Sequence, residues 1–198
     1  MWQGAVWLLC YLERSLMPII TLVTEIHAPI EHCFDLCRDL ELHTRTVAHT
    51  QEKLVGAKTS GFAELGDVLT FEAVHLGVRQ RLTSRITEFE RPVLFADVAV
   101  SGAFASLIHL HTFTSVGNKT LMRDRLEWTS PLGILGRIAD SLFLEHYMTR
   151  FLAIRNRNLK AFAESQQTES ERLGAGFQKE IELSEVVGVE ARNGWRLK

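Results

Sequence analysis

Alternation of apolar and polar residues, interrupted by turn residues, dominates the middle of the chain. Such alternation places successive side chains on opposite faces of a β-strand. Residues that favour turns separate these segments, as in Leu65-Gly66-Asp67, Leu76-Gly77 and Gly117-Asn118. Because no long helical pattern lies between the last six segments, they are expected to form a meander of hairpins in an antiparallel sheet. The expected strands cover residues 19–26, 51–55, 68–75, 78–90, 95–101, 106–115 and 120–128.

Two short helices are expected after the first strand. Ile30, Phe34 and Cys37 follow the i, i+4, i+7 spacing of one apolar helical face. Pro29 suits the first turn of such a helix, where its missing N–H costs nothing. A second short helix is expected over residues 40–47.

The longest helical pattern begins at Pro131 and extends to about Ala163. A helix of this length is expected to lie across a strongly curved sheet, with Arg150, Arg155 and Arg157 on its solvent side. The order β–α–α–β6–α predicts an α+β fold in which the sheet grips the terminal helix. The apolar positions recur at helical spacing over about eight turns, and they are Ile134, Ile138, Leu142, Leu144, Met148, Phe151, Leu152, Leu159 and Phe162.

Both ends of the chain differ from the middle. Residues 1–16 are rich in apolar side chains, but their apolar run is far shorter than the roughly 20 residues of a membrane span and lacks the features of a signal peptide. They are expected to be an extension before Met17, with a short helix that binds a membrane surface or a partner as the alternative. Residues 164–198 begin with a polar run and are expected to form a mobile tail, in which 181–189 forms one weak strand or helix. The folded domain is therefore assigned to residues 17–163.

Three segments of the middle region resemble a known superfamily. Residues 26–39 carry the pattern I-x-A-P-x-x-x-x-F-D-x-x-x-D, residues 85–92 read RITEFERP, and residues 121–133 contain LMRDRLEW followed by PLG. These segments are similar to parts of the START-like helix-grip (SRPBCC) superfamily, which includes polyketide cyclases/dehydrases and lipid-transport proteins. The resemblance covers about residues 18–163 and implies a curved antiparallel sheet of about seven strands, wrapped around a long C-terminal helix. It also implies a cavity for a hydrophobic small molecule between sheet and helix, but it carries over no catalytic residue.

Composition and charge narrow the class of protein. Hydrophobic residues make up 46% and charged residues 23% of the 198 residues, which is ordinary for a globular domain and excludes a wholly disordered chain. The formal net charge of −2 gives no basic excess, so nucleic acid is not an expected partner. Three cysteines, with Cys33 and Cys37 in a helical stretch, indicate reduced thiols rather than a disulfide scaffold. A cytoplasmic protein without an integral membrane segment is therefore expected, and its oligomeric state stays open.

Strand alternation also predicts which residues face the cavity. One strand has an apolar face opposite Thr70 and Glu72, and the last strand has an apolar face opposite Arg123, Arg125 and Glu127. These apolar faces are expected to point inward. On the strand before the last, flanking apolar residues favour an inward direction for two histidines, although the opposite face of that strand is also apolar. With two residues of the long helix, the expected lining set is Phe71, His75, His109, His111, Phe113, Met122, Asp124, Leu126, Trp128, Leu142 and Met148.

The polar members of this set are His75, His109, His111 and Asp124. A carboxylate among apolar neighbours must be paired, and a histidine on the neighbouring strand lies within about 5 Å of it. Three interpretations stay open: a hydrogen-bond network that fixes the strands, a polar patch that orients a ligand, and a metal or acid–base site. No metal ion and no cofactor is assigned, because two histidines alone are a weak signal for a metal site.

These observations favour a protein that binds or transports a hydrophobic small molecule, such as a lipid, a polyketide or a quinone-like compound. One alternative is an enzyme on the same scaffold, a cyclase or dehydratase that uses His109, His111 or Asp124. Another alternative is a co-chaperone or assembly factor that uses the outer face of the sheet. The fold alone does not decide among these functions.

Overall fold

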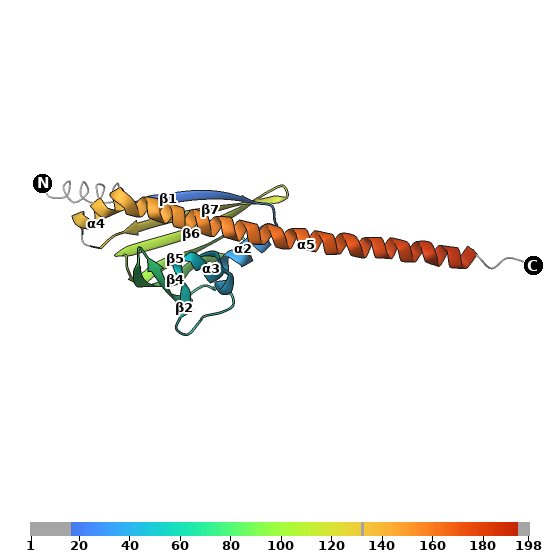
Figure 1. Ribbon diagram of the computed structural model, residues 1–198, viewed down its shortest axis with the longest axis horizontal. Helices are drawn as coiled ribbons and strands as arrows, with labels where there is room; N and C mark the ends of the chain where they lie inside the picture. Colours follow the sequence, from blue (N-terminus) through green and yellow to red (C-terminus); the bar gives the residue numbers. More distant parts are fainter. Residues whose placement is uncertain (1–16, 132, 194–198) are drawn as a thin grey trace, which may run out of the picture. The chain divides into compact units, whose positions relative to one another are not determined.

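Seven antiparallel strands form one sheet in the computed structural model, which describes residues 17–131 and 133–193. The order across the sheet is β1-β7-β6-β5-β4-β3-β2, so the first and last strands pair and the others follow as consecutive neighbours (Figure 1). The predicted antiparallel meander is confirmed, with only the second strand clearly shorter than expected. The strands are β1 (Ile19–Ile26), β2 (Lys53–Val55), β3 (Val68–His75), β4 (Val78–Glu90), β5 (Leu94–Gly102), β6 (Ser106–Val116) and β7 (Lys119–Thr129).

Short helices connect β1 to β2. They are α2 (Ile30–Arg38), α3 (Leu40–Thr46) and the single turn η1 (Ala48–Thr50). The side chain of Asp39 accepts a hydrogen bond of 2.8 Å from the backbone N–H of Leu42 and thereby caps α3. Both predicted short helices are therefore present, and Asp39 separates them.

The helical region after β7 differs from the prediction in two ways. It begins with α4 (Ile134–Ala139) and a π-helical turn, η2 (Asp140–Leu144), and only then continues as α5 (Glu145–Asn193). The predicted end near Ala163 is also wrong, because α5 continues for a further 30 residues to Asn193. Glu and Gln supply ten of those 30 residues and favour helix, and no proline interrupts the stretch.

The chain forms two compact units, Met1–Ala163 and Glu164–Lys198. The described residues of the second unit, 164–193, are helical throughout. The predicted mobility of this tail stays a prediction, and the expectations for residues 1–16 lie outside the described residues. Among the helices of the described part of the chain, none is both long enough and apolar enough to cross a membrane.

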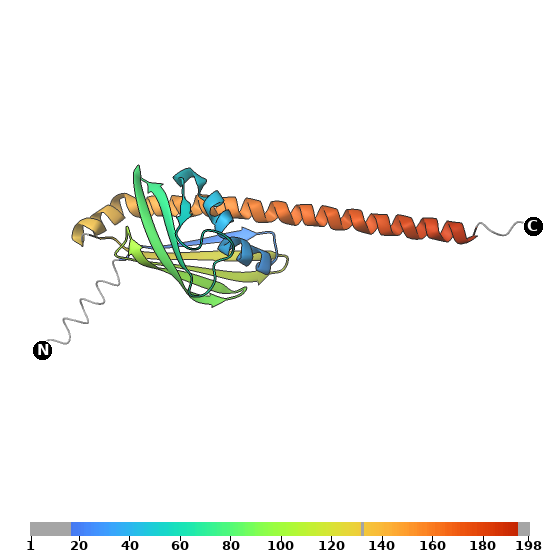
Figure 2. The same cartoon turned by 90° about the horizontal axis from the view of Figure 1, so that it is seen from below.

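Within the first unit, the initial turns of α5 pack on one face of the sheet (Figure 2). Leu152 packs in a buried cluster with Trp128 of β7, and Leu159 packs in a second cluster with Phe34 of α2 and Met122 of β7. Leu152 and Leu159 are each only 2% exposed. The sheet therefore holds the terminal helix, as the helix-grip arrangement implies.

The interior position predicted for Leu142 is wrong, because this side chain is 76% exposed. Leu142 lies in the π-helical turn η2, whose wider winding shifts the phase of the helix, so the stripe counted from Ile138 does not continue into Met148. Asp140 occupies the buried side of this turn instead, where it accepts hydrogen bonds from Trp128 Nε1 at 2.9 Å and from Ser130 Oγ. A buried carboxylate thus fixes the start of the helical region on the last strand.

Two leucines of the helical region give a matched test of this assignment. Leu159→Ala is expected to lower the free energy of unfolding by about 2–5 kcal/mol, because it opens a cavity in a packed core. Leu142→Ala removes an exposed side chain and is expected to change stability by no more than about 0.5 kcal/mol. Urea denaturation of the two variants measures both values. Equal losses would contradict the phase of the helix described above.

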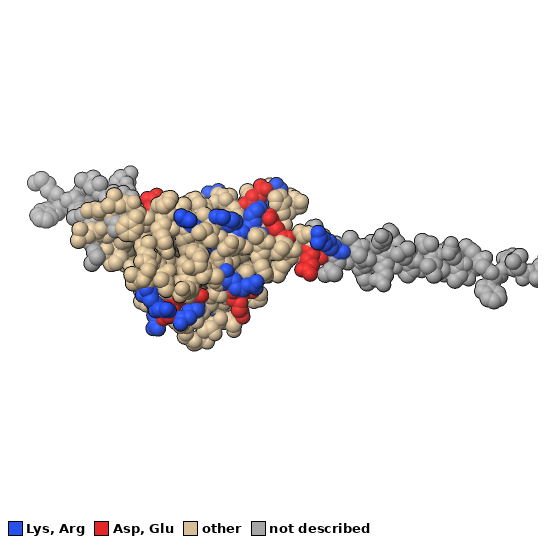
Figure 3. All heavy atoms as spheres, in the orientation of Figure 1, with Lys and Arg blue, Asp and Glu red and all other residues tan. Residues whose placement is uncertain are grey.

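Charged side chains on the outer surface of the first unit pair with one another. Glu72 accepts hydrogen bonds from Arg79 and Arg81 at 2.8 and 2.9 Å, and Lys53 Nζ lies 3.1 Å from the same carboxylate. On the face seen in Figure 3, basic side chains of the described residues lie beside acidic ones. A nucleic-acid surface has basic residues clustered on one face, and whether nucleic acid is a partner stays a prediction from the sequence.

Candidate ligand cavity and its polar wall

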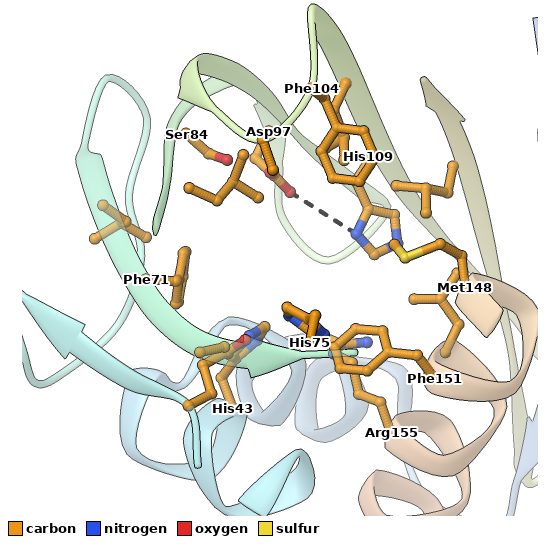
Figure 4. A pocket seen from close by; sticks show the side chains of 18 of the residues that line it. His43, Phe71, His75, Ser84, Asp97, Phe104, His109, Met148, Phe151 and Arg155 are labelled. Carbon is orange, nitrogen blue, oxygen red and sulfur yellow. Dashed lines mark ion pairs between the residues drawn. The ribbon is translucent and has the colours of Figure 1, made fainter. Parts of the chain in front are cut away.

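A cavity of about 180 Å³ lies in the first unit between α3, α5 and the inner face of strands β3 to β7. An engineered apolar cavity of about 150 Å³ accepts benzene, so this cavity has room for a small ring compound. Figure 4 shows aromatic and apolar side chains that approach it from both the sheet and the helix. The apolar lining includes Phe71, Ile86, Phe104, Leu126, Met148 and Phe151.

A buried hydrogen-bond network centred on Asp124 lies behind one wall of the cavity. Asp124 Oδ1 accepts from His111 Nδ1 at 2.6 Å and from His109 Nε2 at 3.2 Å, while Oδ2 accepts from Asn156 Nδ2 at 2.6 Å. The strand register explains this arrangement, because His111 lies directly opposite Asp124 and His109 follows two residues away on the same face. The structure therefore places Asp124 inward, with both histidines as partners.

Helix α5 contributes Arg155 and Asn156 to this network. The solvent-side position predicted for Arg155 is wrong, because its side chain is 3% exposed. Arg155 Nη1 lies 3.7 Å from Asp124 Oδ1, and Nη2 lies 3.3 Å from Cys37 Sγ. Because Arg155 follows Leu152 by three residues and precedes Leu159 by four, it lies on the buried face of the helix. Asp124 supplies the negative charge that a buried guanidinium requires.

Burial and hydrogen bonding set the protonation states in the network. Burial alone would raise the pKa of Asp124, but the hydrogen bonds that it accepts from His111 and His109 hold this pKa well below its usual range. Burial, assisted by His109, lowers the pKa of His111 to about 3. At neutral pH, Asp124 is therefore a carboxylate and His111 is a neutral imidazole that donates its Nδ1–H. Burial also raises the pKa of the Cys37 thiol to about 11, which keeps this thiol protonated.

His109 connects the network to the cavity. Its ring is half-buried, and its Nδ1 lies 4.0 Å from Asp97 Oδ1 on the neighbouring strand β5 (Figure 4). Asp124 can only accept hydrogen bonds, so His109 carries a proton on Nε2 and turns its Nδ1 toward Asp97.

Three residues that line the cavity each bury one polar atom that has no hydrogen-bond partner in the part of the chain that the structure describes. These atoms are Glu52 Oε1, Ser84 Oγ and Arg155 Nε, and Glu52 Oε1 lies 2.8 Å from His43 Nε2. A buried polar atom without a partner costs about 1–3 kcal/mol.

His75 and Tyr147 form a second polar pair at the cavity. His75 Nδ1 and the Tyr147 hydroxyl share a hydrogen bond of 2.7 Å, and the His75 ring packs edge-on against Phe151. Burial lowers the pKa of His75 and raises the pKa of Tyr147. Both groups are therefore uncharged at neutral pH, and they add hydrogen-bonding capacity to the cavity without adding charge.

Six of the eleven residues predicted to line a cavity do line it, and they are Phe71, His75, His109, His111, Leu126 and Met148. The other five do not line it, for four reasons. Phe113 and Met122 belong to the core cluster beneath α2, and Trp128 bonds to the buried Asp140. Asp124 lies behind the two histidines, and Leu142 is exposed.

Sequence reasoning missed several lining residues, notably Ser84, Asp97, Tyr147, Phe151 and Arg155. Asp97 shares a strand face with the apolar Phe95, which is a signal of an inward direction. Tyr147 and Phe151 are four residues apart on α5 and therefore share a helical face. Ser84 and Arg155 carried no such signal, because polar residues are exposed by default.

Comparison with known proteins identifies the fold. No family model and no curated protein matches the chain. Protein TTHA0849 from Thermus thermophilus is similar in structure, with 18% identity, a TM-score of 0.57, and coverage of 74% of this chain and 99% of that one. A START superfamily protein from Mycobacterium smegmatis has 14% identity and a TM-score of 0.57, with 75% and 98% of the two chains covered.

Major latex-like protein 151 from Panax ginseng is similar as well, with 14% identity, a TM-score of 0.55, and coverage of 75% of this chain and 98% of that one. These likenesses, together with the seven-stranded sheet and the long terminal helix, show that the chain has the START-like helix-grip fold. The resemblance seen in the three sequence segments is thereby confirmed at the level of the fold.

Proposed function

We propose that the protein binds or transports a hydrophobic small molecule in the cavity of about 180 Å³. One observation carries the proposal. The cavity is lined by apolar and aromatic side chains, and the half-buried His109 and the hydrogen-bonded pair His75–Tyr147 are polar groups among them. Apolar walls with a few convergent polar groups are characteristic of small-molecule sites.

The size and chemistry of the cavity favour particular ligands among the lipids, polyketides and quinone-like compounds. A volume little above that of an engineered benzene site suits one or two rings or a short chain rather than a two-chain lipid. The half-buried His109 and the His75–Tyr147 pair are suited to a hydroxyl or carbonyl oxygen of the ligand. A quinone-like compound or a small cyclic polyketide therefore fits the proposal best.

A matched pair of variants on strand β3 tests ligand binding. Ala73 is 4% exposed and lines the cavity, whereas the next residue, Val74, has its side chain on the opposite face of the strand. Ala73→Phe is expected to fill the cavity and to weaken binding of 2-naphthol, a two-ring compound with one hydroxyl, by at least about tenfold. Val74→Phe is expected to leave the affinity unchanged.

Ligand-observed NMR measures both affinities, and thermal unfolding verifies that each variant is folded. Equal affinities for the two variants, or no binding by the wild-type protein, would contradict the proposal. Native mass spectrometry of protein purified from its own host identifies the class of a retained natural ligand.

The pair His109–Asp124 supports a second candidate function, a cyclase or dehydratase. Asp124 bonds to Nε2 of His109, so that the other ring nitrogen, Nδ1, is the one that can accept a proton from a bound substrate when the imidazole is neutral. His109→Gln separates the two functions. In a carrier this variant keeps the natural ligand unaltered, as the wild type does, whereas in an enzyme only the variant accumulates unconverted substrate.

A third candidate, a co-chaperone or assembly factor, depends on the outer face of the sheet. Val23 and Ile108 are exposed there, but single exposed apolar residues are normal on soluble proteins. The cavity therefore gives the better-supported function. A cytoplasmic location stays an expectation from the reduced cysteines.

A further inference from the structure

Three side chains that commonly bind metal ions converge on one wall of the cavity. Asp97 of β5 and His109 and His111 of β6 each offer one donor atom, and these atoms all lie within 4.8 Å of one another. Asp97 lies directly opposite His109 in the strand register, and Figure 4 shows the Asp97 carboxylate directed at the His109 ring. The sheet itself therefore brings these groups together.

The hydrogen bonds of Asp124 orient both histidines as metal ligands. Asp124 accepts from His109 Nε2 and from His111 Nδ1, so each ring carries a proton on the nitrogen that faces Asp124. The other nitrogen of each ring, Nδ1 of His109 and Nε2 of His111, is the one that can bind a metal ion. Metal-bound histidines usually donate their other N–H to a carboxylate or carbonyl, which fixes the ring and its tautomer. Asp124 already makes this contact with both rings.

The contact between His109 and Asp97 is incomplete without a cation. In the neutral imidazole, His109 Nδ1 carries a lone pair, and the Asp97 carboxylate 4.0 Å away offers only lone pairs. Two acceptors that face each other at this distance gain nothing unless a positive group lies between them. The local charge also favours a cation, because Arg155 neutralises Asp124 and, among the residues that the structure describes, leaves the negative charge of Asp97 without a cationic partner of its own.

We propose that Asp97, His109 and His111 bind one divalent transition-metal ion, with Asp124 as the residue that positions both histidines. A donor set of two imidazoles and one carboxylate suits Zn²⁺ or Fe²⁺ and leaves coordination positions open. With bonds of about 2.0–2.2 Å, the donors must move closer by about 1 Å, which rotation of the half-buried Asp97 side chain can supply. The open positions face the cavity, where a ligand oxygen would complete the coordination.

This inference does not depend on the proposed ligand binding, and it competes with the acid–base role of His109, since the metal would occupy Nδ1. Titration of the metal-free full-length protein with Co²⁺ tests it directly. We expect one Co²⁺ per chain, visible absorption bands of the bound ion, and competition by Zn²⁺. Absence of binding at millimolar Co²⁺ would overturn the proposal.

Variants with a matched control locate the site. Asp97→Asn and His109→Gln are expected to weaken Co²⁺ binding at least about 100-fold, and Asp124→Asn about 10–100-fold. His75→Gln, which alters another histidine of the same cavity, is expected to keep wild-type affinity. Unchanged affinity in both Asp97→Asn and His109→Gln would overturn the assignment, as would an equal loss in His75→Gln.

A proton is the alternative occupant of the gap between His109 and Asp97. NMR of the histidine rings distinguishes the two cases. If His109 is doubly protonated at neutral pH and its signals do not respond to Zn²⁺, the proton fills the gap and the metal proposal is wrong. The 2-naphthol experiment is read out separately, so failure of either proposal leaves the other testable.

Discussion

Replacement of Asp124 by alanine is expected to lower the free energy of unfolding by about 3–5 kcal/mol. The carboxylate is fully buried and accepts hydrogen bonds from His109, His111 and Asn156. Its removal deprives both histidines of their carboxylate, leaves Asn156 with only the 3.3 Å contact to Thr24 Oγ1, and leaves the buried Arg155 guanidinium without the charge of Asp124. Removing one partner of a buried ion pair lowers the stability by more than the intact pair contributes to it, because the other charge stays buried without a partner.

Urea denaturation at neutral pH measures this loss, and Asp97→Ala is the control. Asp97 faces the same histidine but is only half-buried, so its replacement is expected to cost about 1 kcal/mol or less. A loss in Asp124→Ala no larger than that in Asp97→Ala would mean that the network adds little to stability.

Acidification is expected to destabilise the protein well above the pH range in which carboxylates titrate. The pKa of His111 is about 3 in the folded protein but about 6.5 in an unfolded chain. Between these values the unfolded state binds a proton that the folded state does not, so the free energy of unfolding decreases as the pH falls. The slope contributed by one such group reaches about 1.4 kcal/mol per pH unit.

The pH dependence of His111→Gln isolates this contribution. The variant lacks the titrating imidazole, so between about pH 6 and 4 its stability is expected to fall less steeply than that of the wild type. His75 contributes in the same direction, because burial also lowers its pKa, and His75→Gln measures that part. Parallel curves for the wild type and His111→Gln would show that His111 is protonated in the folded state.

The strands could be predicted from the sequence because each side chain follows a local rule. Val68–His75 alternates between apolar and polar faces, and turn residues mark both of its ends. The π-helical turn η2 could not be predicted in this way. The turn begins at Asp140, which accepts a hydrogen bond from Trp128 of the preceding strand, and helical spacing alone does not contain this contact.

The candidate site likewise contains residues that could be placed from the sequence and one that could not. Asp124, His109 and His111 could be placed together because strand register determines their neighbours. Arg155 could not, because a charged residue is assigned to solvent until a buried partner is known. The partner of Arg155 lies on β7, which is remote in sequence and adjacent only in the folded protein.

Asp124 binds both the cavity wall and the helix that covers the sheet, and this has a thermodynamic consequence. Oδ1 accepts from the two histidines of the wall and lies 3.7 Å from Arg155 Nη1 of the helix, and Oδ2 accepts from Asn156 of the helix. Binding of an occupant at the cavity wall and packing of the helix on the sheet are thus two equilibria that both involve Asp124. Coupling free energies between such equilibria are reciprocal. A cavity occupant that strengthens the network therefore stabilises the packing of the helix on the sheet. Detachment of the helix lowers the affinity for that occupant by the same factor.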